Sequence, residues 1–158
     1  MQLKKLDSSF YEENNHLVQA LDNHSGNWEA GKTRGYGVVV IDFKGLKFAI
    51  PLRTNIKHDA AYITVRSSEP NIKGKGLDYS KAVLIAQQRY ISNEHFKIPA
   101  AEHKKLLDKE HFVTAKFEKY VERYRKAVIV SDKNILNGYE YRFTTLQNYH
   151  VELELLKP

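Results

Sequence analysis

The chain has 158 residues, of which 42% are hydrophobic and 28% charged, a composition typical of one folded domain rather than of a disordered segment. Twenty-five Lys and Arg against nineteen Asp and Glu give a net charge of +6, which favours polyanionic partners, nucleic acid before membrane. The lack of cysteine excludes disulfides and thiolate metal sites, and no apolar run reaches the roughly 18 residues of a membrane span. We therefore expect a single cytoplasmic domain over residues 1–158, with no membrane partner.

The first 90 residues carry the pattern of a small sheet. Residues 3–6 predict a short strand, and Ser8 or Ser9 is a candidate N-cap for a helix over residues 10–21. Residues 22–35 are polar and glycine-rich, which predicts a loop. β-branched and aromatic residues then predict a hairpin with a Lys-Gly turn and two further strands, over Val38–Phe43, Leu46–Leu52, 60–65 and 81–85.

The second half changes to a helical period. Between residues 98 and 128 the apolar residues recur at helical intervals, which predicts one long helix or two consecutive ones. Leu146, Tyr149, His150 and Leu153 have the i, i+3, i+4, i+7 spacing of a short terminal helix. No repeat or linker divides the chain, so we expect an α+β fold: a small, strongly bent antiparallel sheet or SH3-like barrel with added helices.

A polar cluster follows the second strand of the predicted hairpin, in the segment PLRTNIKH. Arg53 can clamp a phosphate in bidentate fashion, and Thr54 offers a hydroxyl donor beside it. Lys32 and Arg34 precede the neighbouring strand, and an antiparallel hairpin brings the start of one strand close to the end of its partner. We therefore predict that these four side chains gather one phosphate, the alternative being that they are solvated turn residues.

Such a site fits RNA cleavage without a metal, which needs a proton acceptor for the ribose 2′-hydroxyl, a proton donor for the leaving 5′-oxygen and positive donors for the phosphorane. His58 lies four residues beyond Thr54 and is a candidate base. His150 lies on the apolar stripe of the predicted terminal helix, where a histidine with a structural role is the default expectation, and it is the second candidate base. His103 and His111 do not have the spacing of a zinc motif, so we expect no metal and no cofactor.

Further basic residues indicate a wider nucleic-acid surface. The predicted long helix has a basic face opposite its apolar one, although a solvated amphipathic helix would show the same pattern. The loop SSEPNIKGKGLDYSK adds Lys73, Lys75 and a pair of glycines but lacks the P-loop pattern, which argues against an ATP site. The candidate RNA-binding residues are Asn55, Lys57, Lys73, Lys75, Lys116, Lys119, Arg123 and Lys126.

The order of several segments resembles one known family. The SSFY stretch, the basic loop before GYGVVVIDFKGLKFAIPLRTN, the GLDYSKAVLI segment, the long basic helix and the closing FTTLQNYHVEL together resemble the endoribonuclease toxins of type III toxin–antitoxin systems, TenpN branch, related to ToxN and AbiQ. The resemblance implies an SH3-like barrel core, as in MazF and Kid, and places Tyr11 near the active site, where a phenol could stack on a base or donate to a phosphate. It also extends through His150. Some relatives have a PLTS turn where this chain has PLRTN, so Thr54 would replace a missing serine.

Together these features predict a metal-independent, sequence-specific endoribonuclease toxin whose products carry a 2′,3′-cyclic phosphate and a 5′-hydroxyl. The resemblance implies two RNA partners, a cellular substrate and a small structured antitoxin made of repeats, in a higher-order toxin–RNA assembly. A non-catalytic RNA-binding module would use the same basic surface without convergent groups. A protein-interaction domain is the second alternative, in which the charge only provides solubility.

Overall fold

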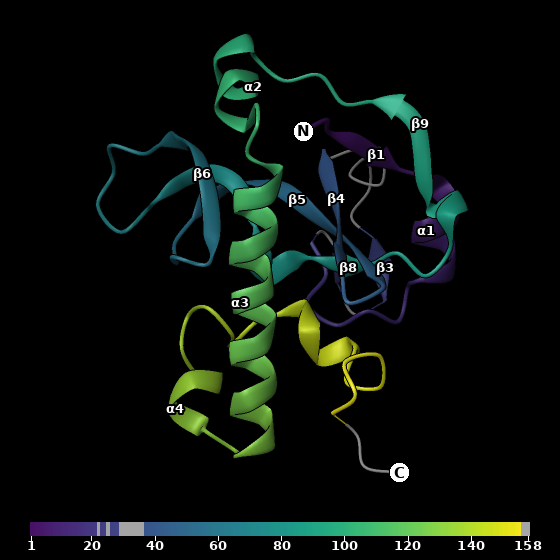
Figure 1. The fold of residues 1–158 in the computed structure, drawn as a ribbon, viewed down its shortest axis with the longest axis vertical. Coiled ribbons are helices and arrows are strands. Elements are labelled where there is room, and N and C mark those ends of the chain that lie inside the picture. Colours follow the sequence, from purple (N-terminus) through teal and green to yellow (C-terminus); the bar gives the residue numbers. More distant parts are fainter. Residues whose placement is uncertain (22, 25, 29–36, 156–158) are drawn as a thin grey trace.

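A computed structural model describes residues 1–21, 23–24, 26–28 and 37–155. The fold is α+β, as predicted, with a seven-stranded antiparallel sheet and, in the described part of the chain, four α-helices. The strand order is β6-β7-β5-β4-β1-β9, and β8 (Val83–Leu84) pairs with β5. Because β6 and β9 do not pair with each other, the sheet is open and is not a closed barrel (Figure 1).

The predicted hairpin forms the centre of the sheet. β4 (Val38–Phe43) and β5 (Leu46–Ile56) pair from Val38↔Pro51 to Phe43↔Leu46. Lys44 and Gly45 join the two strands with φ angles of 48° and 85°, both in the left-handed region that a tight two-residue hairpin turn favours. β5 runs four residues beyond the predicted end at Leu52, because its second half pairs with another strand, β7.

That strand, β7 (Gly74–Asp78), lies within the segment SSEPNIKGKGLDYSK, which the sequence predicts to be a loop. It pairs with β5 on one side and with β6 (Ala61–Arg66) on the other. A Cβ atom on Gly76 would lie 2.0 Å from the backbone oxygen of Tyr62, so only glycine allows the β6 backbone to come this close. The glycines that suggested a loop therefore serve strand packing.

The N-terminal segment differs in detail from the prediction. β1 (Lys4–Leu6) forms as expected and pairs with β4 and with β9 (Ile91–His95). The following helix α1 spans only Ser8–Glu13, and its N-cap is Asp7, whose carboxylate accepts a hydrogen bond from the Ser9 amide. Two short strands, β2 (Asn23–His24) and β3 (Asn27–Trp28), pair within the predicted loop.

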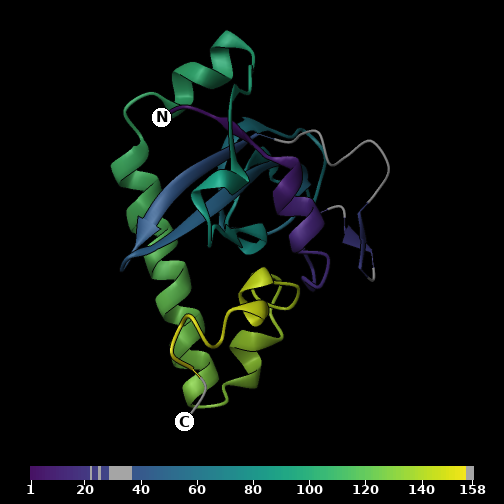
Figure 2. The ribbon, with the colours of Figure 1, turned by 90° about the vertical axis from the view of Figure 1, so that its right-hand side faces the viewer.

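Two consecutive helices form the predicted helical region, α2 (Ala100–Leu106) and α3 (Glu110–Ile129). α3 packs on the sheet through a buried stripe, in which Phe117 contacts Phe48 of β5 with ring centroids 5.3 Å apart. Its C-terminal half extends past the sheet and lies beside α4 (Lys133–Leu136) and the C-terminal segment (Figures 1 and 2). The predicted terminal helix is instead a 3-10 helix, η4 (Thr145–Asn148), followed by turns.

Two more 3-10 helices lie near the sheet, η2 (Tyr79–Lys81) directly after β7 and η3 (Gln88–Tyr90) before β9. In the part of the chain that is described, no helix combines the length and the apolar character that a membrane crossing requires.

Candidate functional site

A buried carboxylate, Asp78, lies where β7 ends and η2 begins, with no exposed surface. Its Oδ1 atom accepts hydrogen bonds from the amide of Ser80 at 3.0 Å and from the Ser80 hydroxyl at 2.6 Å. Burial alone would raise the pKa of Asp78, but contacts with His58, Ser80 and Arg53 outweigh it, so the pKa lies below its ordinary value. Asp78 is therefore a buried anion that organises the groups around it.

Arg53 contributes a cation to this carboxylate. It lies in β5 opposite Gly76 of β7, and its Nη1 atom is 3.0 Å from Oδ2 of Asp78. The Arg53 side chain is 36% exposed, and within the described residues this is its one hydrogen bond. The remaining guanidinium N–H groups are thus free to bind an anion at the surface.

His58, two residues after β5, binds the other oxygen of the same carboxylate. Its Nε2 atom lies 3.1 Å from Oδ1 of Asp78 and 3.2 Å from the Ser80 hydroxyl. The Nδ1 atom accepts a hydrogen bond from the Ala60 amide at 3.1 Å, so the neutral ring carries its proton on Nε2 and donates it to Asp78. We call Arg53, His58, Asp78 and Ser80 the Asp78 cluster.

Lys81 lies beside this cluster in η2 and is 9% exposed. Its ammonium group donates to the backbone oxygens of Gln19 and Phe143, both at 2.9 Å. Burial, with the nearby Arg53 charge, lowers the pKa of Lys81 to about 8, while the Asp78 charge acts in the opposite direction. Lys81 thus joins an N-terminal and a C-terminal segment next to the cluster.

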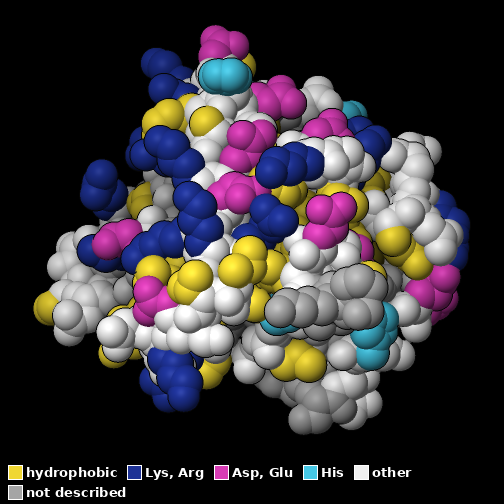
Figure 3. Space-filling model, turned by 60° about the horizontal axis from the view of Figure 1, so that its bottom comes forward, with side chains coloured by type: hydrophobic (Ala, Val, Ile, Leu, Met, Phe, Trp, Pro, Cys, Tyr) yellow, Lys and Arg dark blue, Asp and Glu magenta, His cyan; other side chains and the backbone are white. Residues whose placement is uncertain are grey.

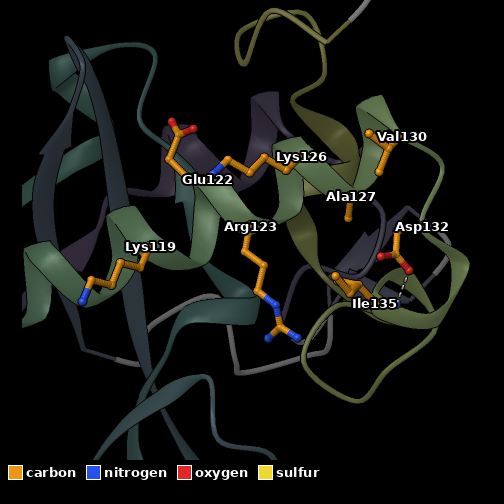
Figure 4. A pocket seen from close by; sticks show the side chains of 8 residues that line it. All are labelled: Lys119, Glu122, Arg123, Lys126, Ala127, Val130, Asp132 and Ile135. Carbon is orange, nitrogen blue, oxygen red and sulfur yellow. Dashed lines mark hydrogen bonds between the residues drawn. The ribbon is translucent and has the colours of Figure 1, made fainter.

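Three hollows adjoin one another along α3, because they share lining residues. Their volumes are about 500, 220 and 360 Å³. Arg123 lines all three, and its side chain leaves α3 on the side opposite to Glu122 (Figure 4). We call the three hollows together the basic groove; the cations that line it are Lys57, Lys73, Lys116, Lys119, Arg123 and Lys126.

Acidic residues compensate only part of this charge. Lys73 pairs with Asp59 at 3.1 Å, and Arg123 pairs with Glu140 at 3.2 Å. The other four cations of the groove form no ion pair with a described residue. In the space-filling view, most Lys and Arg side chains of the visible face lie in its left half, with Asp and Glu between them (Figure 3).

His58 also lines the largest hollow of the groove. It therefore belongs both to the wall of a basic groove and to the Asp78 cluster, and it connects the two. Six of the eight candidate RNA-binding residues line this groove. The other two do not: Lys75 pairs with Glu102 of α2 at 3.0 Å, and Asn55 is exposed in β5.

Thr54 and Asn55 occupy an irregular part of β5. The pairing with β7 shifts register between Arg53 and Ile56, and Asn55 has a φ angle of 55°. Such a bulge turns side chains out of the ladder, and both residues are exposed. Thr54 therefore lies next to Arg53 at the surface, while Lys32 and Arg34, predicted to complete the phosphate site, lie outside the described residues.

The other two candidate catalytic residues have different surroundings. Tyr11 is buried in α1, where its ring packs edge-on against Phe10 and Trp28. The Nε2 atom of His150 is 2.6 Å from the hydroxyl of Tyr124 in α3, and burial lowers the pKa of His150. In the described part of the chain, no hydrogen bond or ion pair joins His150 to the Asp78 cluster.

Sequence reasoning missed Asp78, Ser80 and Lys81. The available signal was the Asp-x-Ser pattern in LDYSK, since an aspartate two residues before a serine often caps a helical turn. Within the described residues, no group of three or more His, Asp or Glu side chains is arranged to hold a metal ion.

No protein family model matches this chain, and neither a curated protein nor a solved structure is significantly similar to it.

Proposed function

We propose that the protein is a metal-independent endoribonuclease in which the Asp78 cluster acts on RNA that lies in the basic groove. The supporting observation is the position of His58, which lines the groove and binds the same buried carboxylate as Arg53. A groove with unpaired lysines suits a polyanion, and a partly exposed arginine that shares the Asp78 carboxylate with His58 suits a phosphate.

The proposed reaction is a transesterification. The ribose 2′-oxygen attacks the phosphorus, the bond from phosphorus to the 5′-oxygen breaks, and the products are a 2′,3′-cyclic phosphate and a 5′-hydroxyl. The free N–H groups of Arg53 stabilise the charge that develops on the non-bridging oxygens, with the Thr54 hydroxyl beside them. Water supplies the proton that the departing 5′-oxygen takes up.

His58 is the proposed acceptor of the 2′-proton, because among Tyr11, His58 and His150 it is the one placed on the groove. The proton goes to Nδ1, which exchanges its bond to the Ala60 amide for the substrate hydroxyl. The Asp78 carboxylate, bound to Nε2, then stabilises the imidazolium that forms.

The biological role that we propose is that of a toxin in a type III toxin–antitoxin system, restrained by a structured repeat RNA. This part rests on the order of segments from SSFY to FTTLQNYHVEL. Tandem short repeats directly upstream of the gene would support the assignment, and an upstream region without them would contradict it.

A non-catalytic RNA-binding module is the second candidate, and one observation favours it. Both ring nitrogens of His58 already have protein partners, as expected of a histidine that only holds structure. Incubating labelled RNA with the protein in EDTA separates the two candidates. The endonuclease shortens the RNA, whereas the binding module shifts its mobility and leaves its length unchanged.

A further inference from the structure

The largest hollow of the basic groove has features that RNA cleavage by the Asp78 cluster does not use. It measures about 500 Å³, within the usual range of small-ligand sites, and lies between the segment after β5 and the segment around α4. Lys57, Lys73 and Arg123 bring positive charge to its wall, against Asp59 and Glu140. The volume and charge together fit an anionic ligand about as large as a nucleotide.

An aromatic ring, that of Tyr139, lines this hollow without a partner among the described residues. Tyr139 is 79% exposed, and it forms no hydrogen bond or ring contact with any described residue. Tyr141, two residues later, is in contrast 4% exposed and stacks on Tyr120 with ring centroids 4.6 Å apart. Tyr139 therefore presents a free aromatic face beside a basic pocket, the arrangement on which unpaired bases stack.

The cations around this ring are available to a ligand. Lys57 forms no ion pair with a described residue. In the Lys73–Asp59 pair both side chains are at least half exposed, so Lys73 exchanges Asp59 for a phosphate at little cost. Arg123 is held by Glu140 and by the ring of Tyr141. A phosphate therefore meets two exposed lysines here, while Arg123 in the same wall already has protein partners.

The pocket is next to the proposed reaction centre, because His58 is part of its wall. It also continues into the second hollow, which Lys116 and Lys119 line, so a nucleotide bound here can belong to a longer strand. These two connections favour one residue of a single-stranded RNA over a free nucleotide.

From these observations we infer that the pocket is a nucleotide subsite: Tyr139 stacks on one unpaired base of a single-stranded RNA, and Lys57 and Lys73 bind the phosphates that flank it. This inference rests on the proposed function, since the strand in the subsite is the one that the Asp78 cluster cuts. It adds that base stacking at Tyr139 sets where along the strand the cut falls.

The test measures binding of 2′-O-methyl RNA octamers, which lack the nucleophile and cannot be cleaved, by fluorescence anisotropy at fixed salt. Tyr139→Ala should weaken binding of an octamer with bases by about tenfold, the size expected for the loss of one stacked base. Tyr139→Trp should retain it. An abasic ribose-phosphate octamer should bind wild type and Tyr139→Ala equally, whereas the double variant Lys57→Ala/Lys73→Ala should weaken both octamers.

Phe143→Ala is the matched control, since Phe143 is a half-exposed aromatic that lines none of the three hollows, and it should bind like wild type. Equal affinity of wild type and Tyr139→Ala for the octamer with bases would overturn the subsite, as would a wild-type protein that binds neither octamer. Cleavage of unmodified RNA is assayed separately. If the protein cleaves RNA but Tyr139→Ala binds the octamer as wild type does, only the subsite is refuted. If Tyr139→Ala binds more weakly but the wild-type protein cleaves no RNA, only the nuclease proposal is refuted.

Discussion

The Nη1 atom of Arg53 lies 3.0 Å from the Oδ2 atom of Asp78, a carboxylate with no exposed surface. The two residues are 25 positions apart in the chain and meet because β5 and β7 are neighbouring strands. Asp78 holds one nitrogen of the guanidinium, and the Arg53 side chain is partly exposed, which leaves its other N–H groups available to a ligand. The arginine is thus oriented before any ligand arrives, which lowers the entropic cost of binding a phosphate.

Replacing Asp78 by asparagine should destabilise the protein by about 3 kcal/mol, because it leaves Arg53 and His58 without their shared anion. Asparagine can still accept the hydrogen bond from the Ser80 amide, so the helical turn η2 should remain. Urea unfolding at pH 7 measures the difference. A change below about 0.5 kcal/mol would show that the Asp78 cluster does not hold the two strands together.

The pH dependence provides a control for the same residue. The pKa of Asp78 is lowered in the folded protein, so its contribution to stability is complete above the ordinary value of 3.8 and is lost as the pH falls below it. The stability difference between wild type and Asp78→Asn should therefore shrink below about pH 4. A constant difference down to pH 2 would contradict the lowered pKa.

Arg53→Ala should abolish both RNA cleavage and growth arrest on expression, while costing only about 1 kcal/mol of stability because the side chain is partly exposed. Arg53→Lys should restore little activity. The planar guanidinium of arginine can bind the Asp78 carboxylate and a phosphate at the same time, whereas the compact ammonium group of lysine cannot. Arg66→Ala is the matched control, because Arg66 is exposed at the end of β6 and lines none of the three hollows. Growth arrest by Arg53→Ala at the wild-type level would refute the assignment.

Lys81 should give the protein an unusual gain of stability in mild alkali. Its pKa falls from 10.5 to about 8 on folding, so between these values the unfolded chain binds more protons, and stability rises with pH. The expected gain is about 1–2 kcal/mol from pH 8 to pH 9.5, below the range where tyrosines ionise. Lys81→Met should lack this gain. Thermal unfolding at several pH values tests it, and equal pH profiles of the two proteins would contradict it.

Neutralising Lys116, Lys119 and Lys126 together should weaken binding of a structured RNA more than cleavage of a short substrate, because a folded RNA spans more of the basic groove. The log–log salt slope of binding should also become shallower, by roughly 0.7 to 0.9 for every phosphate that the variant no longer neutralises. Filter binding over a salt series measures both effects.

The matched control for this triple variant replaces Lys104, Lys109 and Lys133, which are exposed, carry the same charge and line none of the three hollows. The control should bind structured RNA nearly as wild type does. If both triple variants lose affinity equally, net charge rather than the groove determines binding.

The sequence predicted those parts of the fold where local pattern and tertiary packing agree. The hairpin around Lys44 and Gly45 and the two helices before Val130 are examples. The prediction was wrong where long-range contacts decide. Gly74 and Gly76 have the local chemistry of a loop, yet β6 and β7 approach so closely that they require glycine in a strand.

The same reason explains why the candidate site was predicted only in part. Arg53 and His58 were found because they follow a clear strand, but their shared partner Asp78 belongs to the strand that the glycines concealed. The six cations of the groove come from the segments flanking β6 and from α3, and their convergence depends on how α3 packs on the sheet.

The chemistry of the cut ends tests the central proposal most directly. Purified protein is incubated in EDTA with an end-labelled RNA, and a second RNA carries a 2′-deoxy residue at the mapped cut. We predict a 2′,3′-cyclic phosphate and a 5′-hydroxyl from the first RNA, no cut at that position in the second, and no cut of either by Arg53→Ala. An intact RNA with wild-type protein, or cleavage that persists at the 2′-deoxy residue, would contradict the proposal.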